Sequence, residues 1–459
     1  MEDLQFVIDH GLSRGADFVE ARYQKRFRTM AMVKNGELDN ATSGVLEGVG
    51  IRALKDGSWG FAATSSLDRT TLLKKVEEAV RLAAGSASAK TSKVKLAPTR
   101  VTKMKVKADV KDDPGKHPFE EKIKIALELD KFMKEYSKEI ASNWVRYDEN
   151  SIEKHYVNSE GSDCYLFDVK PDLTIMVIAR RGDVMTEVIE GVCRTGGWEI
   201  FKVTEPIAMA KKACERAVKL LKAKVAPSGS HTAVLDPELV GLLSHEAIGH
   251  TVEADLVISG TAATGKIGQK VAADMVTMVD DGTIPWCAGW VPFDDEGVEG
   301  QKTLVIDKGI LKSYLHNRET AATFNVEPTG NGRAWNYRDA PIVRMRATYI
   351  ETGDWSREEI IEDTKDGLLL MGSGSGQADS NAEFMFGVQE AYEIRRGEIG
   401  EPFRGITISG NAYDVLKSVD AVGKDFSLEM GRGHCGKMQL AKVDGGGPTV
   451  RCRVLFGGA

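Results

Sequence analysis

Two histidines bracket a glutamate in the segment SHEAIGH, at His245, Glu246 and His250. Imidazole is a common zinc ligand, and a neighbouring carboxylate can take a proton from water that a bound metal has made more acidic. In the motif HExxH the histidines are four residues apart, about 40° apart around an α-helix, so both reach one ion. The segment therefore indicates metal-dependent hydrolysis.

The spacing departs from that motif by one residue. His250 follows His245 by five positions, and on a regular α-helix such side chains point about 140° apart, too far for one ion. A one-residue π-bulge would return His250 to the face of His245, and Gly249 would lower the cost of that distortion. We therefore predict a widened or kinked turn at residues 247–250. The alternative is two unrelated polar residues on a capped helix.

A third metal ligand must come from elsewhere in the chain, since a catalytic zinc normally has three protein ligands and one open position. Cys435 lies between Gly433 and Gly436, which would let the backbone approach a metal and leave the thiolate unobstructed. A lone cysteine is more often a small buried apolar residue. Spacing alone leaves five candidates open, which are Glu253, Asp255, His316, His434 and Cys435.

The helix that would carry the histidines has a recognisable start. Asp236 is an N-cap acceptor and Pro237 suits the first helical position, and apolar residues at 239, 240, 242 and 243 supply a buried stripe. The segment VAPSGS at residues 225–230 precedes it and marks a change to glycine-rich sequence with short strands. We predict two domains, residues 1–224 and residues 225–459.

The first half reads as helices and strands in layers. Asn35-Gly36 and Asp56-Gly57 predict hairpin turns around a strand at 45–53, and a helix follows candidate caps at Ser65 and Ser66. Further helices are expected at 119–140 and 204–224, with a strand at 173–179 between them. The predicted fold is α+β, with an N-terminal layered α/β domain and a C-terminal β-rich domain, barrel-like or a rolled sheet, that carries the metal-site helix.

Composition is that of an ordinary globular protein. The 459 residues are 42% hydrophobic and 28% charged, with a net charge of -7, which argues against disorder and against a chain dedicated to nucleic acid. Residues 86–116 are rich in lysine but contain no aromatic residue to stack on bases, so an exposed linker or edge strand is favoured over a nucleic-acid arm.

The cellular setting is predicted from apolar runs and cysteines. Apolar stretches such as residues 173–179 fall short of the roughly 20 residues of a membrane helix, so no membrane association is expected. The six cysteines are scattered and include no CxxC pair. This usage indicates a reducing, cytoplasmic location.

Two glycine-rich segments resemble nucleotide-binding loops. Residues 260–266 nearly match a P-loop, but Ile267 replaces the hydroxyl residue that would hold magnesium. Residues 372–377 fail the pattern GxGxxG. They are expected to form a loop or bulged strand, and the alternative is a flexible strip beside a substrate.

Several separated blocks together resemble the TldD/PmbA family of metallopeptidases. The blocks occur in family order and cover residues 244–255, 279–282, 294–297, 328–333 and 435–437. The hairpin-rich start is also similar to the family's N-terminal domain. This resemblance implies a zinc site made by His245, His250 and Cys435, with Glu246 as catalytic base. Because the HExxxH set is complete, the chain resembles the TldD branch, whereas the PmbA branch lacks the motif.

The resemblance also implies substrates and partners. Family members cleave small unstructured peptides in an enclosed site, and they form homodimers or heterodimers with a PmbA-type subunit. One departure is His434, which stands where an apolar residue is expected and could assist or compete as a ligand. The alternative function is a non-catalytic scaffold that modulates a nucleic-acid enzyme such as gyrase, in which case the basic residues near 90–111 would matter and Glu246 would not.

Overall fold

The structure, a computed structural model, describes residues 4–428 and 433–458, and its N-terminal part is built on one long sheet. Seven strands form this sheet in the order β3-β2-β1-β5-β6-β4, with β7 also paired to β6. The elements in chain order are α1 (Gln5–Ser13), β1 (Phe18–Lys34), β2 (Glu37–Lys55), β3 (Ser58–Thr64), α2 (Arg69–Ala87), β4 (Lys103–Lys107), a 3₁₀ turn (Pro114–Lys116), α3 (Phe119–Tyr136), β5 (Ile140–Asn158), β6 (Asp163–Arg181), β7 (Val184–Cys193), α4 (Ile200–Val203) and α5 (Pro206–Leu220).

Both predicted hairpin turns are confirmed. Asn35 and Gly36 have φ of 53° and 92°, and Asp56 and Gly57 have φ of 51° and 73°. These positive values match the twist of the strands they join, β1 to β2 and β2 to β3. The predicted cap of α2 is wrong, because Asp68 is the N-cap and its Oδ1 accepts a hydrogen bond from the Thr71 amide at 2.8 Å.

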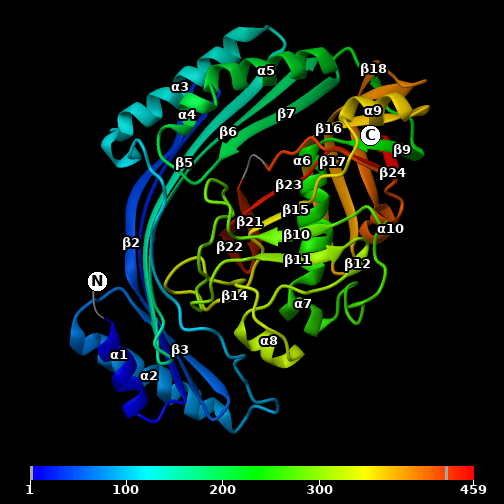
Figure 1. The fold of residues 1–459 in the computed structure, drawn as a ribbon. Coiled ribbons are helices and arrows are strands. Elements are labelled where there is room, and N and C mark those ends of the chain that lie inside the picture. Colours follow the sequence, from blue (N-terminus) through cyan, green and yellow to red (C-terminus); the bar gives the residue numbers. More distant parts are fainter. Residues whose placement is uncertain (1–3, 429–432, 459) are drawn as a thin grey trace.

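The long sheet arches around the C-terminal half of the molecule (Figure 1). Helices α1 and α2 pack on one end of it through an apolar cluster, and α3 and α5 pack on the other end through a second cluster. The helices expected at 119–140 and 204–224 are present but shorter, ending at Tyr136 and Leu220. The concave side of the sheet is left to face the C-terminal half.

The lysine-rich stretch supplies an edge strand. Strand β4 pairs in parallel with β6, from Lys103 opposite Asp163 to Lys107 opposite Phe167. Lys103, Lys105 and Lys107 are exposed while the residues between them are partly covered. This agrees with the edge-strand interpretation, since charged side chains on an edge oppose pairing with other chains.

The C-terminal half contains a closed barrel and a separate five-stranded sheet, of order β12-β11-β10-β15-β23. The barrel closes because β16 pairs with both β9 and β17, and β24 and β19 complete the ring. The elements are β8 (Lys224–Val225), β9 (Gly229–Leu235), α6 (Pro237–Leu242), a π-helical segment (Leu243–Gly249), a 3₁₀ turn (His250–Val252), α7 (Ala254–Ser259), β10 (Met278–Asp281), β11 (Lys302–Asp307), β12 (Ile310–Leu311), α8 (Arg318–Phe324), β13 (Gly332–Arg333), β14 (Ile342–Val343), β15 (Ala347–Ile350), α9 (Arg357–Asp363), β16 (Asp366–Ala378), β17 (Glu383–Arg395), β18 (Glu398–Arg404), β19 (Ile406–Asn411), α10 (Ala412–Lys417), β20 (Ala421–Val422), β21 (His434–Lys437), β22 (Gln439–Lys442), β23 (Asp444–Gly446) and β24 (Val450–Gly458).

The predicted α+β class, with a barrel-like C-terminal part that carries the metal-site helix, is confirmed. Helix α6 contacts β16 of the barrel and β23 of the five-stranded sheet, so it is held between the two (Figure 1). Its Gly241 is required there, because a Cβ atom would lie 2.6 Å from the backbone nitrogen of Gly446. The division into domains 1–224 and 225–459 remains a proposal, supported by the change of sheet near Lys224.

Neither glycine-rich segment is arranged as a nucleotide-binding loop. Residues 260–266 follow α7 and lead into turns without a helix. Residues 372–377 lie within β16, and the register against β17 shifts between Ser373 and Gly376. The second segment is therefore a bulged strand, as expected. Within the described part of the chain, no helix has the length and apolar character required to cross a bilayer.

Candidate metal centre

The helix that carries the histidines widens where the spacing requires it. Asp236 caps α6 by accepting a hydrogen bond from the Leu239 amide at 2.9 Å, as predicted. Residues Leu243–Gly249 are π-helical, and the amide of His250 donates to the carbonyl of His245, five residues earlier. The extra residue per turn returns His250 to the side of His245. The predicted widening is confirmed, although it begins earlier than residue 247.

Gly249 serves a different purpose from the one expected. Its backbone is ordinary right-handed helix, with φ of -54° and ψ of -47°, so glycine is not needed for the conformation. A Cβ atom at this position would lie 2.0 Å from Sδ of Met345. Glycine therefore allows the widened turn to pack closely against Met345, whose buried side chain would have to move to admit a larger residue.

Replacing Gly249 with alanine is expected to lower the free energy of unfolding by about 1 to 3 kcal/mol, because the added methyl group overpacks this contact. Urea denaturation followed by circular dichroism measures the change. Gly85→Ala in α2 is the matched control, since nothing lies within 4 Å of the added Cβ. An equal stability of the two variants would contradict the packing argument.

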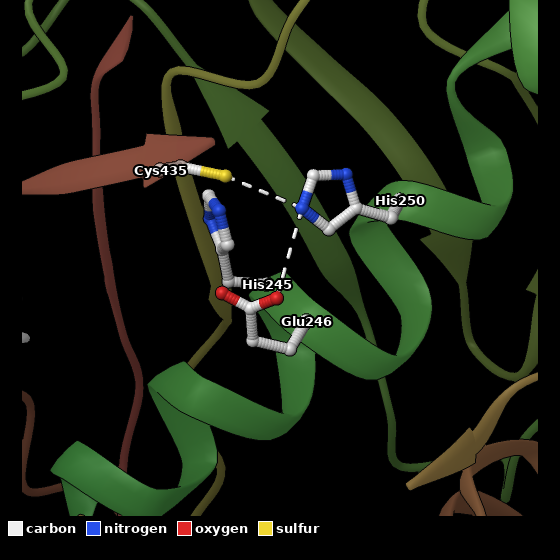
Figure 2. Close-up of side chains that lie close together, drawn as sticks. All are labelled: His245, Glu246, His250 and Cys435. Carbon is white, nitrogen blue, oxygen red and sulfur yellow. Dashed lines mark hydrogen bonds and ion pairs between the residues drawn. The ribbon is translucent and has the colours of Figure 1, made fainter. Parts of the chain in front are cut away.

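The structure brings His245, Glu246, His250 and Cys435 into one group. One potential ligand atom from each lies within 4.8 Å of those of the other three. Sγ of Cys435 lies 3.2 Å from Nε2 of His250, and Oε2 of Glu246 lies 3.7 Å from the same nitrogen. In Figure 2 the sulfur points from its strand into the space between the two rings. Tetrahedral zinc with normal bond lengths would place N and S ligand atoms about 3.5 Å apart, close to this spacing.

The surroundings of His245 are those expected of a histidine that binds a metal ion. The residue is fully buried, and neither ring nitrogen has a hydrogen-bond partner among the described residues. A buried polar group without a partner is costly, and metal coordination would satisfy one of these nitrogens. The donor set of two imidazoles and a thiolate is one that zinc accepts. The residues therefore fit a zinc ion.

The charges of the group favour a thiolate. Burial alone would raise the pKa of Cys435, but His245 and His250 outweigh it and lower that pKa to about 5. The other five cysteines are buried as well, and burial raises the pKa of each. Because the thiolate is the form that binds metal, Cys435 is set apart chemically from the rest.

A buried carboxylate orients His250. Oε2 of Glu253 lies 2.8 Å from Nδ1 of His250, and Glu253 is wholly inaccessible to solvent. Burial would raise the pKa of Glu253, but His250, Lys437 and Arg344 together outweigh burial and lower that pKa. This contact leaves Nε2 of His250 facing Cys435. Metal-bound histidines commonly have such a carboxylate partner, which fixes the orientation of the ring. The sequence offered Glu253 as a candidate ligand, and the structure places it behind the His250 ring instead.

Lys437 connects the cysteine strand to the same carboxylate. Its Nζ donates to Asp255 at 2.8 Å and lies 3.3 Å from Oε2 of Glu253. Strand β21 therefore carries both the thiol and a cation that meets the residues following the motif. The sequence gives little sign of this role, because its only local trace is a lysine two residues after Cys435.

The N-terminal sheet also contacts the cysteine hairpin. Oδ2 of Asp172, on β6, lies 3.2 Å from Nζ of Lys442 and 3.4 Å from Nδ1 of His434. His434 and Lys442 are opposite each other on β21 and β22, next to the pair of Cys435 and Ala441. Asp172 is fully buried, and Lys442 and His434 outweigh burial to hold its pKa below the usual range. His434 thus faces Asp172 and is outside the metal group.

Replacing Asp172 with asparagine is expected to lower the free energy of unfolding by about 3 to 5 kcal/mol, since it leaves the buried Lys442 ammonium without its carboxylate. Chemical denaturation measures the loss. Asp183→Asn, at the exposed β6–β7 turn, is the control and should change stability by less than about 0.5 kcal/mol. A loss no larger than that of the control would show that the hairpin does not depend on this contact.

The remaining candidate ligands lie elsewhere. His316 is buried, its Nδ1 lies 3.2 Å from Oγ1 of Thr320, and burial lowers its pKa to about 4. Asp255 is occupied by Lys437. Of the five candidates that spacing left open, Cys435 alone joins the two histidines and Glu246 in the group described.

A groove reaches the centre from outside. It has a volume of about 510 Å³, and Glu246 and His250 line it, whereas His245 and Cys435 are nearly inaccessible. Its other walls come from the 3₁₀ turn, α7 and the residues after it, the end of β16 with the turn that follows, and β21, namely Thr251, Leu256, Ser259, Gly260, Thr261, Ala378, Asp379, Ser380, Gly436 and Lys437. The carboxylate and one imidazole are therefore the groups of the centre that a ligand in the groove would meet.

Known proteins resemble the chain over nearly its whole length. Family models of the PmbA/TldA metallopeptidases match residues 19–83 (domain 1), 112–221 (central domain) and 228–455 (C-terminal domain). A metalloprotease of Methanocaldococcus jannaschii is 37% identical over 457 residues, covering 98% of each chain. A protein of Saccharolobus solfataricus described as a zinc metalloprotease TldD homolog is 31% identical over 448 residues, covering 96% of each.

Solved structures share the fold. A candidate modulator of a DNA gyrase from Thermotoga maritima has a TM-score of 0.79 at 24% identity, covering 98% of each chain. TldE from Thermococcus kodakarensis has a TM-score of 0.75 at 22% identity, covering 99% of this chain and all of the other. At this identity the likeness concerns architecture alone. The family models and the identity to the archaeal metalloproteases show that the chain belongs to the PmbA/TldD metallopeptidase family.

Proposed function

We propose that the chain is a zinc peptidase whose metal is held by His245, His250 and Cys435. The observation that carries this proposal is the convergence of the three side chains with Glu246, around a buried histidine whose ring nitrogens have no partner among the described residues. The Saccharolobus relative, named as a zinc metalloprotease, supports the choice of metal. The complete motif supports placement in the TldD branch.

Each residue has a separate task in the proposed reaction. Zinc, when bound, would lower the pKa of a water molecule toward about 7 and polarise the carbonyl of the scissile peptide bond. Glu246 would accept the proton of the attacking water and return it to the leaving amine. Glu246 lines the groove and its Oε2 lies 3.7 Å from Nε2 of His250. This position suits a group that must reach both the attacking water and the leaving amine. Glu253 would hold the His250 ring in the orientation that presents Nε2.

The proposed substrates are small unstructured peptides. Two of the three ligands are buried, and the groove is bounded on several sides by chain segments, so a reacting peptide bond must enter in an extended form. A folded protein surface would not reach this depth. We also propose a homodimer or a heterodimer with a PmbA-type subunit, and a cytoplasmic location, which six free cysteines support.

Metal removal tests the function directly. The purified chain should contain about one zinc per subunit by elemental analysis, and an unstructured peptide should be cleaved into fragments that mass spectrometry identifies. Treatment with a chelator is expected to stop cleavage, and added zinc should restore it, because the attacking water depends on the metal. Cleavage that continues after complete removal of metal would overturn the proposal and leave a non-catalytic, scaffold-type function as the alternative.

A further inference from the structure

A second cavity lies between the N-terminal sheet and the C-terminal half, with a volume of about 50 Å³. None of the four residues of the metal group lines it. Three side chains of its floor form one row across β1, β5 and β6, since Arg26 is opposite Ile152 and Ile152 is opposite Asp168. Opposite residues on neighbouring strands share a face, so all three point toward the C-terminal half. The other wall carries three aromatic rings, those of Trp290, Phe293 and Trp335.

Two guanidinium groups at this cavity have no carboxylate partner. Arg26, from the sheet, is 5% exposed, and its Cζ lies 3.8 Å from the centroid of the Trp335 ring. It donates to the carbonyl of Trp335, and its Nε has no hydrogen-bond partner among the described residues. Arg333, from the opposite wall, donates only to the carbonyls of Met345 and Lys442. In the described ranges, no carboxylate oxygen lies within 4.0 Å of either group. Burial lowers the pKa of each to about 10, although the charge of Asp295 acts on both groups in the opposite direction.

The three lysines of the same cavity are paired, which makes the arginines distinct. Nζ of Lys154 lies 2.9 Å from Asp295, Nζ of Lys170 lies 2.5 Å from Asp168, and Nζ of Lys442 lies 3.2 Å from Asp172. A buried charge is costly unless an opposite charge or hydrogen bonds compensate it. The two guanidinium groups have no such carboxylate, so a bound anion would supply the opposite charge that the lysines already have.

One acceptor at the cavity is also unused. Asp168 binds Lys170 through Oδ2, while its Oδ1 is buried and has no partner among the described residues. A simple anion would be repelled by this oxygen. A ligand that carries a cation beside its anion would satisfy both sides.

We propose that this cavity binds a small zwitterionic α-amino acid, with its carboxylate at Arg26 and Arg333 and its ammonium group at Oδ1 of Asp168. The planar guanidinium fork matches a carboxylate, and a charged oxygen is a strong acceptor for an ammonium group. At roughly 10 to 15 Å³ per water-sized group, the volume holds about three to five such groups, which suits glycine or a residue little larger. The proposal does not depend on the proposed peptidase function.

Binding of glycine to the whole chain tests the proposal. Isothermal titration calorimetry should show one saturable site, with glycine at least about tenfold tighter than acetate or methylamine, which each lack one charged group. Glycine can also chelate zinc, so the titration is repeated on chelator-treated protein and on Cys435→Ala, where the cavity should still bind it. Failure of the metal-centre proposal would leave this result unchanged.

Variants assign the binding to the cavity. Arg26→Met should weaken glycine binding at least about tenfold, and Asp168→Asn should reduce it to the level of acetate. Arg28→Met is the control for Arg26, because Arg28 lies two residues further on β1, pairs with Asp148 and is outside the cavity. Circular dichroism checks that each variant is folded. The proposal is overturned if glycine does not bind saturably to metal-free protein, if acetate binds equally well, or if Arg26→Met binds glycine as the parent does.

Discussion

Glu246→Gln is expected to reduce kcat/KM for peptide cleavage by about 10²- to 10⁴-fold, the usual contribution of a general acid or base. Glutamine has nearly the same shape but cannot accept the proton of the attacking water. Glu246 is 31% exposed on the groove and is not one of the three proposed ligands. Zinc content, measured by elemental analysis, should therefore remain that of the parent.

The control for this substitution is Glu358→Gln on α9, an exposed glutamate outside the metal group and the groove. It should leave both cleavage and zinc unchanged. Undiminished cleavage by Glu246→Gln would remove this residue from the reaction. Loss of zinc together with cleavage would instead assign Glu246 to the ligand set.

Cys435→Ala is expected to lower zinc affinity by a factor on the order of 10² or more. Zinc sites bind with about 10 to 16 kcal/mol, so one ligand in such a set is worth roughly 3 kcal/mol. The thiolate is also the negative charge that offsets the metal, since both other ligands are neutral when they coordinate. Competition with a chromogenic chelator measures the affinity, and cobalt substitution adds a thiolate-to-metal absorption band that the variant should lack.

Cys214→Ala on α5 is the matched control, because this cysteine is also buried but lies outside the metal group. It should keep the parent's zinc affinity and, with cobalt, the thiolate band. If Cys435→Ala also retained both, the third ligand would have to be sought among other groups. The outcome thus separates the assignment of Cys435 from the existence of a metal site.

Local features of the fold could be read from the sequence because their causes are local. The hairpin turns at residues 35–36 and 56–57 follow from backbone conformations that Asn-Gly and Asp-Gly adopt at low cost. The cap at Asp236 and the widened turn before His250 follow from contacts within a few residues. The cap of α2 could not be assigned from the sequence, because several polar residues precede that helix. Asp68 is the cap because the helix begins directly after it, at Arg69.

The role of Gly249 also shows the difference between local effects and packing. The sequence suggested that Gly249 eases a distortion of its own helix, which is a local effect. The structure shows instead that Sδ of Met345, far along the chain, would meet a side chain there. Such close approaches depend on how elements pack, so they cannot be read from the neighbours of a glycine.

The residue types and spacing alone contain the parts of the proposed metal site, namely two imidazoles, a carboxylate beside them, and the helix distortion needed for both imidazoles to share one face. Spacing left the third ligand open among five residues, and family resemblance pointed to Cys435. The other contacts of the group come from the packing of distant segments, which brings a thiol 3.2 Å from an imidazole 185 residues away and places Asp172 of the other sheet beside the hairpin of that thiol. Local conformation follows from short-range sterics and hydrogen bonds, whereas these contacts depend on the packing of two sheets and a barrel around one helix.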